Sequence, residues 1–531
     1  MNEPARRAAA LCRWIAAGIL ALSFLLLLVG TLHWPLAGDA SLMHYVAFLM
    51  VRAKTPYRDI VEMNMPGALM VDFLVIHTLG AGSMAWRAFD FALMGASILA
   101  MIEVARPRDW VAGLYAGVLL AAIHASDGIF DAGQRDFVVA VVILIGYAAL
   151  FRALRGNTPA WMLLFGLAMG IAATIKPTFL LLGPALLVWV GFVRRSQGLR
   201  SLAWGVTGFF VPLLTTMALL MRWHALHVFL TGTRRIMVYH ASLARRPIGW
   251  LLLHSVAPLW PLVGLGIFVV VFERRRRLTI EGAALGIGAV VSLFSYVVQA
   301  KGYPYQRYPL IALVLLAIGI ALFRALRGKG VVRVLGYAGV GFGVLFLAPR
   351  AVWRADHYDW RNTEFLDLLE SDLDRLGGPA LSGHVQCIDT TGGCYNALYE
   401  RQLIQSTGFL YDEFLFNDDR AGVVADNRKA FWNALQAHPP ALVVVVDGLF
   451  PSEISGFDKL TRWPAFATYL EENYSVYAER RPEHWVYWWR RGDPPKSYRL
   501  YVRKAGPVLD GLERPASRDE DWLNSAAMAE R

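Results

Sequence analysis

The segment IAAGILALSFLLLLVGTLHWPLAGDA (residues 15–40) decides the fold class. Its apolar run from Ile15 to Trp34 has about the 20 residues that a helix needs to cross a hydrocarbon core roughly 30 Å thick. Three arginines precede the run within residues 1–13, as they would in a secretory signal. The run is long for a signal and lacks a clean small-x-small cleavage site, so we interpret it as an uncleaved anchor. A carboxylate, Asp39, follows soon after it.

Similar apolar runs recur along the chain. The 531 residues are 56% hydrophobic and 18% charged, whereas a soluble chain of this length would carry more charge and shorter apolar runs. We predict eleven membrane-spanning helices, near residues 14–34, 86–104, 110–125, 137–151, 160–175, 178–193, 201–221, 250–272, 280–298, 308–323 and 331–349. The predicted fold class is therefore a polytopic α-helical membrane protein with a soluble α/β domain at its C-terminal end.

The charged residues predict the orientation of these helices. The formal net charge is +11, but the arginines lie mostly in short loops, which fits membrane orientation better than nucleic-acid binding. With a cytoplasmic N-terminus, Lys and Arg are about threefold denser in the inner loops than in the outer ones. Residues 67–79 are too few to span and include Asp72, so we predict a re-entrant or interfacial helix there. Counting them as a span would reverse every later loop and break the charge rule.

The polar part after about residue 350 has the mixed periodicity of an α/β domain. Its spacing predicts helices over Glu364–Leu376, Asn427–Ala437 and Ala465–Tyr474, and strands over 441–446, 476–477 and 485–489. The predicted domains are a transmembrane catalytic domain over 1–350, an extracytoplasmic α/β domain over 351–504 and a disordered tail over 505–531. Cys387 and Cys394 could form a disulfide if this domain lies outside the cytoplasm.

Several common motifs are absent from the sequence. It has no Walker loop, Rossmann fingerprint, HExxH or GxSxG motif, so activated nucleotides are not expected as direct substrates. No Cys and His residues have metal-ligand spacing. The glycine-rich stretch 336–343 lies inside a predicted span, where small residues let helices pack closely.

Acidic residues gather on the predicted outer side, near the ends of spans. They are Asp39, Asp59, Glu62, Asp72, Asp127, Asp131 and Asp136. We interpret most of them as solvated loop residues. Asp39 and Asp136 stand out, because each lies at the lip of a span where lipid and water meet.

Short motifs near these carboxylates follow one another in a distinctive order. They are Asp39, Tyr45, Pro56-Tyr57-Arg58-Asp59, Pro66, Arg135-Asp136, Thr174-Ile175-Lys176-Pro177 and the stretch from Lys301 through Tyr305 and Arg307 to Pro309. This order, with the later 439–445 and 470–474 segments, resembles the GT-C fold polyprenyl-phosphate-sugar-dependent glycosyltransferases over about residues 1–490. That group includes Rgt-like bacterial enzymes, the aminoarabinose transferases of lipid A and the protein O-mannosyltransferases. The chain departs from the family at Ala40, where an acidic residue is common, and at Asn64 or Met65, where Lys is common.

The resemblance implies an inverting, metal-independent glycosyltransferase without a cofactor, at the outer face of a bacterial inner membrane. The expected partners are a polyprenyl-phosphate sugar donor, membrane lipids and an envelope glycan, lipid or protein acceptor, and no nucleic acid. Asp39 is the expected base, which takes the proton of the attacking hydroxyl. Asp136 is the expected second carboxylate and orients the acceptor or Arg135. The alternative for each is a helix cap or a solvated side chain.

Cations and tyrosines near the outer ends of spans are candidates for binding the donor phosphate. The predicted donor or substrate residues are Tyr45, Tyr57, Arg58, Glu62, Arg135, Lys176, Lys301, Tyr305 and Arg307. Snorkelling to headgroups is the alternative for the cations, and interfacial aromatic belts are the alternative for the tyrosines. Loop 222–249, with its four closely spaced arginines, could clamp a phosphate or simply attract headgroups. His44 is interpreted as a structural histidine.

Two other classes of function compete with the enzyme. A transporter or flippase of a lipid-linked or anionic substrate would show internal repeats and charges in mid-span. We find no repeat, and the carboxylates lie at span ends. A non-catalytic assembly partner that kept the fold is the second alternative, and the departure at Ala40 is compatible with it.

Overall fold

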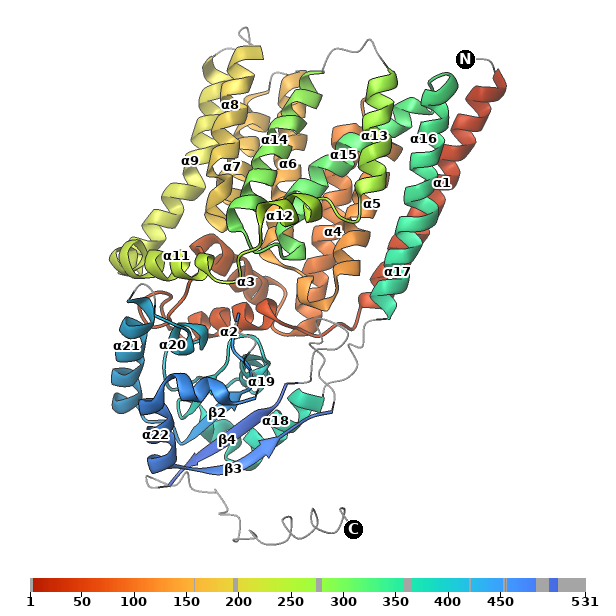
Figure 1. The fold of residues 1–531 in the computed structure, drawn as a ribbon. Helices are drawn as coiled ribbons and strands as arrows, with labels where there is room; N and C mark the ends of the chain where they lie inside the picture. Colours follow the sequence, from red (N-terminus) through yellow and green to blue (C-terminus); the bar gives the residue numbers. More distant parts are fainter. Residues whose placement is uncertain are drawn as a thin grey trace, which may run out of the picture. The chain divides into compact units, whose positions relative to one another are not determined.

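The computed structural model describes residues 3–156, 158–193, 199–273, 279–357, 364–419, 422–451, 454, 456–483 and 496–504. These residues form two compact units. The first holds the described residues up to 357 and a short segment within 418–424, and the second holds the other described residues from 364 onward. Each unit has its own architecture (Figure 1).

The first unit is helical throughout. Its α-helices are α1 Glu3–Thr31, α2 Asp39–Val51, α3 Pro66–Thr78, α4 Ser83–Ala105, α5 Trp110–Asp127, α6 Arg135–Gly156, α7 Pro159–Ile175, α8 Leu182–Val193, α9 Leu199–Arg222, α10 Leu226–Val228, α11 Arg234–Ser242, α12 Ile248–His254, α13 Trp260–Phe272, α14 Ile280–Gln299, α15 Tyr308–Ala325, α16 Gly330–Phe342 and α17 Ala348–Asp356. Shorter helical turns are η1 Ile129–Asp131, η2 Pro177–Leu181, η3 Phe229–Thr233, η4 Pro304–Arg307 and η5 Gly343–Leu347. The last helix, α17, continues past the predicted domain boundary at residue 350.

Eight helices among the described residues are long and apolar enough to cross a membrane. They are Arg6–Thr31, Ser83–Ala105, Trp110–Asp127, Arg135–Gly156, Leu199–Arg222, Ile280–Gln299, Pro304–Ala325 and Gly330–Asp356. The chain is thus a multi-pass membrane protein. The total of eleven spans stays a prediction, because it also counts the shorter apolar helices Pro159–Ile175, Pro177–Val193 and Trp260–Phe272.

One predicted span is wrong as a continuous helix. The run 250–272 is divided into α12, which ends at His254, and α13, which begins at Trp260. Pro258 lies in the break and Pro261 at the start of α13. Proline has no N–H to donate and clashes with the preceding turn, so the apolar run does not continue as one helix.

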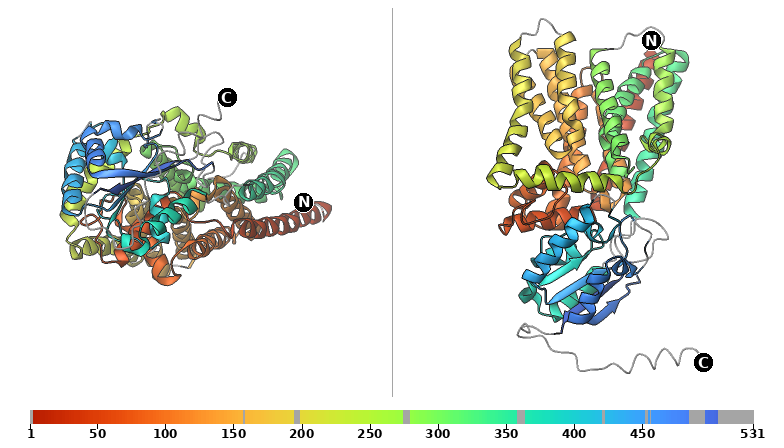
Figure 2. Two further views of the ribbon diagram at one scale, coloured as in Figure 1. Left: turned by 90° about the horizontal axis from the view of Figure 1, so that it is seen from below. Right: turned by 60° about the vertical axis from the view of Figure 1, so that its left-hand side comes forward.

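Some helices of this unit lie across the ends of the long helices rather than along them. Among them are α2 and α11 (Figures 1 and 2). Residues 40–49 of α2 are all buried, so this helix is packed on every side. The helix predicted over 67–79 is observed as α3, beside α2. These elements close one end of the bundle.

The second unit has an α/β architecture. Its helices and turns are α18 Glu364–Arg375, η6 Gly378–Leu381, α19 Cys394–Glu400, α20 Glu413–Phe416, α21 Val423–Ala437, η7 Asp458–Arg462 and α22 Pro464–Asn473. Its strands are β1 Val385–Ile388, β2 Leu442–Val446, β3 Tyr474–Arg480 and β4 Tyr498–Arg503, in the sheet order β1-β2-β4-β3. Strands β1 and β2 pair in parallel, and β4 is antiparallel to both of its neighbours.

The sequence patterns predicted one interior strand of this sheet, β2, and part of one edge strand, β3. All of β2 is buried, as expected for a continuous apolar run. The strands β1 and β4 were not predicted, and the predicted strand 485–489 and the tail 505–531 lie outside the described residues. A disulfide joins Cys387 in β1 to Cys394 at the start of α19.

Gly336 allows α16 to pack closely against the C-terminal end of α15. A Cβ on Gly336 would lie 2.9 Å from the backbone nitrogen of Leu326 and 3.0 Å from the carbonyl carbon of Ala325. A Cβ on Gly341, in the same helix, would meet nothing within 4 Å. Close helix packing therefore requires a small residue at 336 and not at 341.

We expect Gly336→Val to lower the stability of the full chain by about 1–3 kcal/mol, because the backbone of α15 must move away. The matched control is Gly341→Val, which makes the same change in the same helix without a close neighbour. Thermal unfolding of both variants in detergent measures the difference. Equal unfolding temperatures would contradict the packing role of Gly336.

Candidate active site

Asp39 is the first residue of α2, where the chain turns sharply after α1. Gly38 makes this turn with φ 55° and ψ −131°, a conformation that residues with a Cβ avoid. A Cβ at this position would also lie 2.6 Å from the ring of Phe130. The turn therefore depends on glycine, and it fixes the backbone position of Asp39 at the start of α2.

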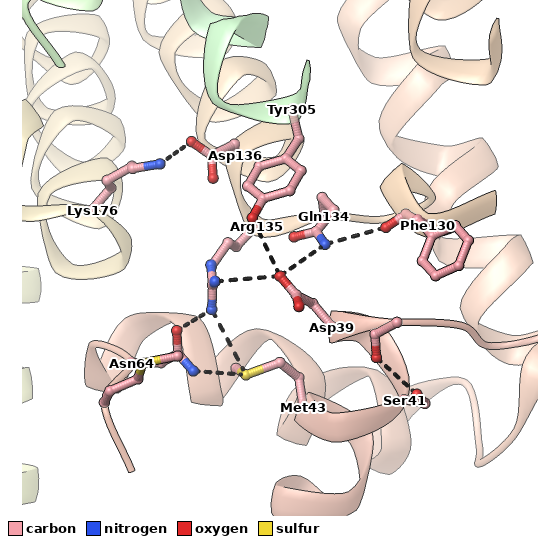
Figure 3. Close-up of polar contacts among 12 residues, drawn as sticks. Asp39, Ser41, Met43, Asn64, Phe130, Gln134, Arg135, Asp136, Lys176 and Tyr305 are labelled. Atoms are coloured by element: carbon pink, nitrogen blue, oxygen red, sulfur yellow. Dashed lines mark hydrogen bonds and ion pairs between the residues drawn. The ribbon is translucent and has the colours of Figure 1, made fainter. Parts of the chain in front are cut away.

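Three side chains, all far from Asp39 in the sequence, surround this carboxylate (Figure 3). The Gln134 amide donates to Asp39 Oδ2 at 3.3 Å, and the Tyr305 hydroxyl donates to the same oxygen at 3.4 Å. Arg135 Nη2 lies 3.6 Å from it. The Asp39 side chain remains 32% exposed, beside a cavity of about 20 Å³, which is room for about one water. Asp39 is thus held in place and still accessible.

Arg135 connects Asp39 to the segment between α2 and α3. Its guanidinium donates to the side-chain oxygen of Asn64, and the Asn64 amide donates to Glu62 Oε1 at 2.6 Å. The Tyr57 hydroxyl donates to the Asn64 carbonyl oxygen at 2.6 Å. The predicted residues Tyr57 and Glu62 are therefore connected to Arg135 through Asn64.

Asp136 and Lys176 form an ion pair next to this group (Figure 3). Asp136 is buried at the start of α6, and Lys176 follows α7. Burial lowers the pKa of Lys176, while the neighbouring carboxylate of Asp136 acts in the opposite direction. Arg135, which lies beside Asp39, directly precedes Asp136 in the chain. The two predicted carboxylates, Asp39 and Asp136, therefore lie at the same end of the bundle.

A buried carboxylate, Asp90, holds the loop that carries Gln134 and Arg135. Its Oδ2 accepts from Arg87 at 2.9 Å, and its Oδ1 contacts His124 Nε2 at 2.9 Å and accepts from the Gly133 N–H at 2.7 Å. Arg87 and His124 are both buried. A Cβ on Gly133 would lie 2.4 Å from the ring of Trp86, so the loop requires glycine there.

Three of the acidic residues interpreted above as solvated are instead buried or paired in the structure. Asp72 is buried and contacts His44 Nδ1 at 2.8 Å, which also makes His44 a structural residue. Asp127 accepts from Arg307 at 2.9 and 3.1 Å and from the Tyr308 hydroxyl at 3.2 Å. The solvated interpretation is therefore wrong at both positions.

Asp131 is the third of these carboxylates. It is fully buried in η1, and no described residue donates a hydrogen bond to its carboxyl oxygens. Burial raises the pKa of Asp131 well above its usual value, and the nearby charge of Asp127 raises it further. A carboxyl in these surroundings favours its neutral, protonated form.

For the remaining predicted donor residues the structure shows other contacts. Tyr45 is fully buried in α2 with its ring 5.9 Å from that of Phe48. Arg58 is exposed and pairs with Asp59. Lys301 donates to the His240 carbonyl oxygen at 2.8 Å, and Arg307 is engaged by Asp127. The structure thus brings together Asp39, Arg135 and Tyr305, with the pair Asp136–Lys176 beside them.

The fold can now be compared with known proteins. No protein-family model matches the sequence, and no curated protein matches it. Among solved structures, ArnT from Cupriavidus metallidurans bound to undecaprenyl phosphate matches with a TM-score of 0.63 and 15% identity, over 93% of this chain and 98% of that one. The chain has the GT-C fold.

Two further structures agree with this fold. ArnT from the same organism in the apo state matches with a TM-score of 0.59 and 16% identity, over 95% of this chain and 99% of that one. The oligosaccharyltransferase from Archaeoglobus fulgidus tethered with an acceptor peptide matches with a TM-score of 0.51 and 10% identity, over 81% of this chain and 69% of that one. At identities of 10–16%, these matches show that the chains share a fold.

Several residues of the site were missed from the sequence. Gln134 lies directly before the predicted Arg135-Asp136 pair, and Asn64 was noted only as a departure from the family. The clearest overlooked signal was Arg87 and Asp90, two charges three positions apart inside a predicted span. Ionisable residues within a membrane segment are costly and are kept where they have partners.

We expect Asp90→Leu to destabilise the full chain by about 3–5 kcal/mol, because it leaves the buried guanidinium of Arg87 without its carboxylate. The double variant Arg87→Met with Asp90→Leu removes both charges and is expected to lose less. Thermal unfolding in detergent compares the two. A double variant that is no more stable than the single one would contradict the importance of this ion pair.

Proposed function

We propose that this GT-C chain transfers a sugar from a polyprenyl-phosphate donor to an acceptor hydroxyl, with inversion at C1. The observation that carries the proposal is the partly exposed carboxylate of Asp39, with Arg135 3.6 Å away and Lys176 nearby. A carboxylate next to cations is what this reaction requires, because it needs a base for the acceptor and positive charge for the leaving phosphate.

In the proposed reaction the acceptor oxygen attacks C1 of the sugar from the face opposite the phosphate. The new C1–O bond forms as the bond between C1 and the phosphate oxygen breaks, and the electron pair leaves with the polyprenyl phosphate. Asp39 takes the acceptor's hydroxyl proton. The Gln134 and Tyr305 hydrogen bonds hold this carboxylate in one orientation, which reduces the reorganisation needed to reach the transition state.

Arg135 and Lys176 are the proposed cations for the leaving phosphate. Their side chains are 24% and 13% exposed, so each is partly shielded from water and keeps a stronger field than an exposed charge. Arg135 also takes the place of the loop lysine that the family commonly has, because Asn64 stands in that loop and contacts Arg135. Asp136 holds Lys176 in position in the absence of donor.

The finer parts of the proposal follow from the loop charges and the resemblance. The reaction takes place on the outer face of a bacterial inner membrane, with the N-terminus in the cytoplasm. The transferred sugar is a hexose or a pentose, and the acceptor is an envelope glycan, a lipid or a protein. The C-terminal α/β unit is proposed to shape or gate the acceptor site.

We expect Asp39→Asn to reduce transfer by about 10²–10⁴-fold, because asparagine cannot take the acceptor proton. The full chain is reconstituted with a panel of polyprenyl-phosphate sugars and envelope acceptors, and glycan transfer is measured. Asp356→Asn, which changes an exposed carboxylate of α17, is the control and should keep wild-type activity. Robust transfer by Asp39→Asn would eliminate the proposed base, and no transfer by the wild type with any donor would disfavour the enzyme.

We expect Arg135→Gln and Lys176→Met each to weaken binding of undecaprenyl phosphate by about tenfold or more, because each removes a charge-assisted contact. Asp39→Asn should leave this binding close to the wild-type value, since it removes no cation. Lipid titration by native mass spectrometry measures all three variants. Unchanged binding by both cation variants would show that the phosphate binds elsewhere.

A further inference from the structure

A second cavity lies in the helical unit, away from the side chains that surround Asp39. It has a volume of about 230 Å³, larger than the roughly 150 Å³ apolar cavities that accept a benzene molecule. Its walls come from α5, from the segment between α12 and α13, and from the stretch 342–354. Ser126 in its wall precedes Asp127, which pairs with Arg307, so the cavity lies toward the Asp39 end of the bundle.

The lining of this cavity is apolar over most of its surface. Its apolar walls are Leu119, Ala122, Ile123, Phe342, Phe346 and Leu347, together with two prolines. An apolar chain that enters such a space leaves water or lipid without losing a hydrogen bond. The cavity is therefore suited to a hydrocarbon chain.

Two irregular stretches of backbone create this space. Pro258 lies in the break between α12 and α13, where the helix does not continue, and Pro261 lies in the first turn of α13. On the opposite wall, η5 is a π-helical turn between α16 and α17. Such turns are rare and are frequent at functional sites. The cavity thus lies between two irregular backbone segments, the break between α12 and α13 and the turn η5.

Two arginines stand at one edge of the apolar space. Arg350 and Arg354 lie one turn apart on α17, both line the cavity and both are exposed. The guanidinium of Arg350 lies 5.8 Å from the ring centre of Phe346, and no ion pair of either arginine is found within the described chain. Trp353, between them, is 57% exposed, as is common for a side chain at headgroup depth.

We propose that this cavity binds an anionic membrane phospholipid, with part of an acyl chain between α5 and η5 and its phosphate on Arg350 and Arg354. Two guanidinium groups one turn apart are opposite in charge to a lipid phosphate, and both can donate hydrogen bonds to its oxygens. Their aliphatic stems extend along the apolar wall while the charged heads reach the headgroup level. This lipid site is separate from the donor site around Asp39 and does not depend on the proposed transfer reaction.

The test uses the purified, delipidated full chain and native mass spectrometry, with phosphatidylglycerol, phosphatidylcholine and undecaprenyl phosphate titrated separately. We expect the variant Arg350→Gln with Arg354→Gln to bind phosphatidylglycerol about thirtyfold more weakly than the wild type. The control, Arg200→Gln with Arg222→Gln, removes two exposed arginines at the ends of α9 and should bind normally. Ala122→Leu, which fills the apolar wall, should weaken binding of phosphatidylglycerol without removing a charge.

Three results would overturn the proposal. The first is equal phosphatidylglycerol binding by the wild type and the Arg350/Arg354 variant. The second is equal binding of phosphatidylcholine and phosphatidylglycerol by the wild type, which would remove the requirement for an anionic headgroup. The third is loss of undecaprenyl phosphate binding, rather than phosphatidylglycerol binding, in the Arg350/Arg354 variant, which would make this cavity part of the donor site.

Discussion

The candidate site depends on one buried carboxylate, Asp90, and on its hydrogen bond to the Gly133 N–H. The same group satisfies Arg87 and His124, so it ties α4, α5 and the loop before α6 together. In surroundings of low dielectric these interactions are strong when all partners are present and costly when one is missing. The next residues after Gly133 are Gln134 and Arg135, which contact Asp39, so the position of these side chains depends on the network around Asp90.

A second series of polar contacts reaches Asp39 from the segment between α2 and α3. Glu62 and Tyr57 hold Asn64, Asn64 contacts Arg135, and Arg135 lies beside Asp39. The segment 52–65 thereby becomes part of the site, although few of its side chains reach the carboxylate. In the proposed function, Arg135 of α6 supplies the positive charge that the resembled family often takes from a lysine in the loop where this chain has Asn64.

Charged groups at this end of the bundle serve different purposes according to their partners. Asp127 and Arg307 satisfy one another and carry little net charge as a pair. Arg350 and Arg354 line an apolar cavity, and within the described chain no carboxylate is found to pair with them. The first kind of group stabilises the protein and positions its site, whereas the second kind favours an anion from outside, which we infer to be a phospholipid.

The sequence by itself determined the membrane class and most helix positions. It also singled out Asp39, Arg135, Asp136, Lys176 and Tyr305, which the structure places at one end of the bundle. Apolar length is a local property, and the order of short motifs is written along the chain, so both survive without coordinates. The tertiary structure alone decided which charges pair: Asp39 meets Gln134 and Tyr305 across separations of 95 and 266 residues. It also decided that Asp72, Asp127 and Asp131 are not solvated and that 250–272 breaks into two helices. Burial and pairing arise from packing between distant segments, and no local pattern of residues specifies them.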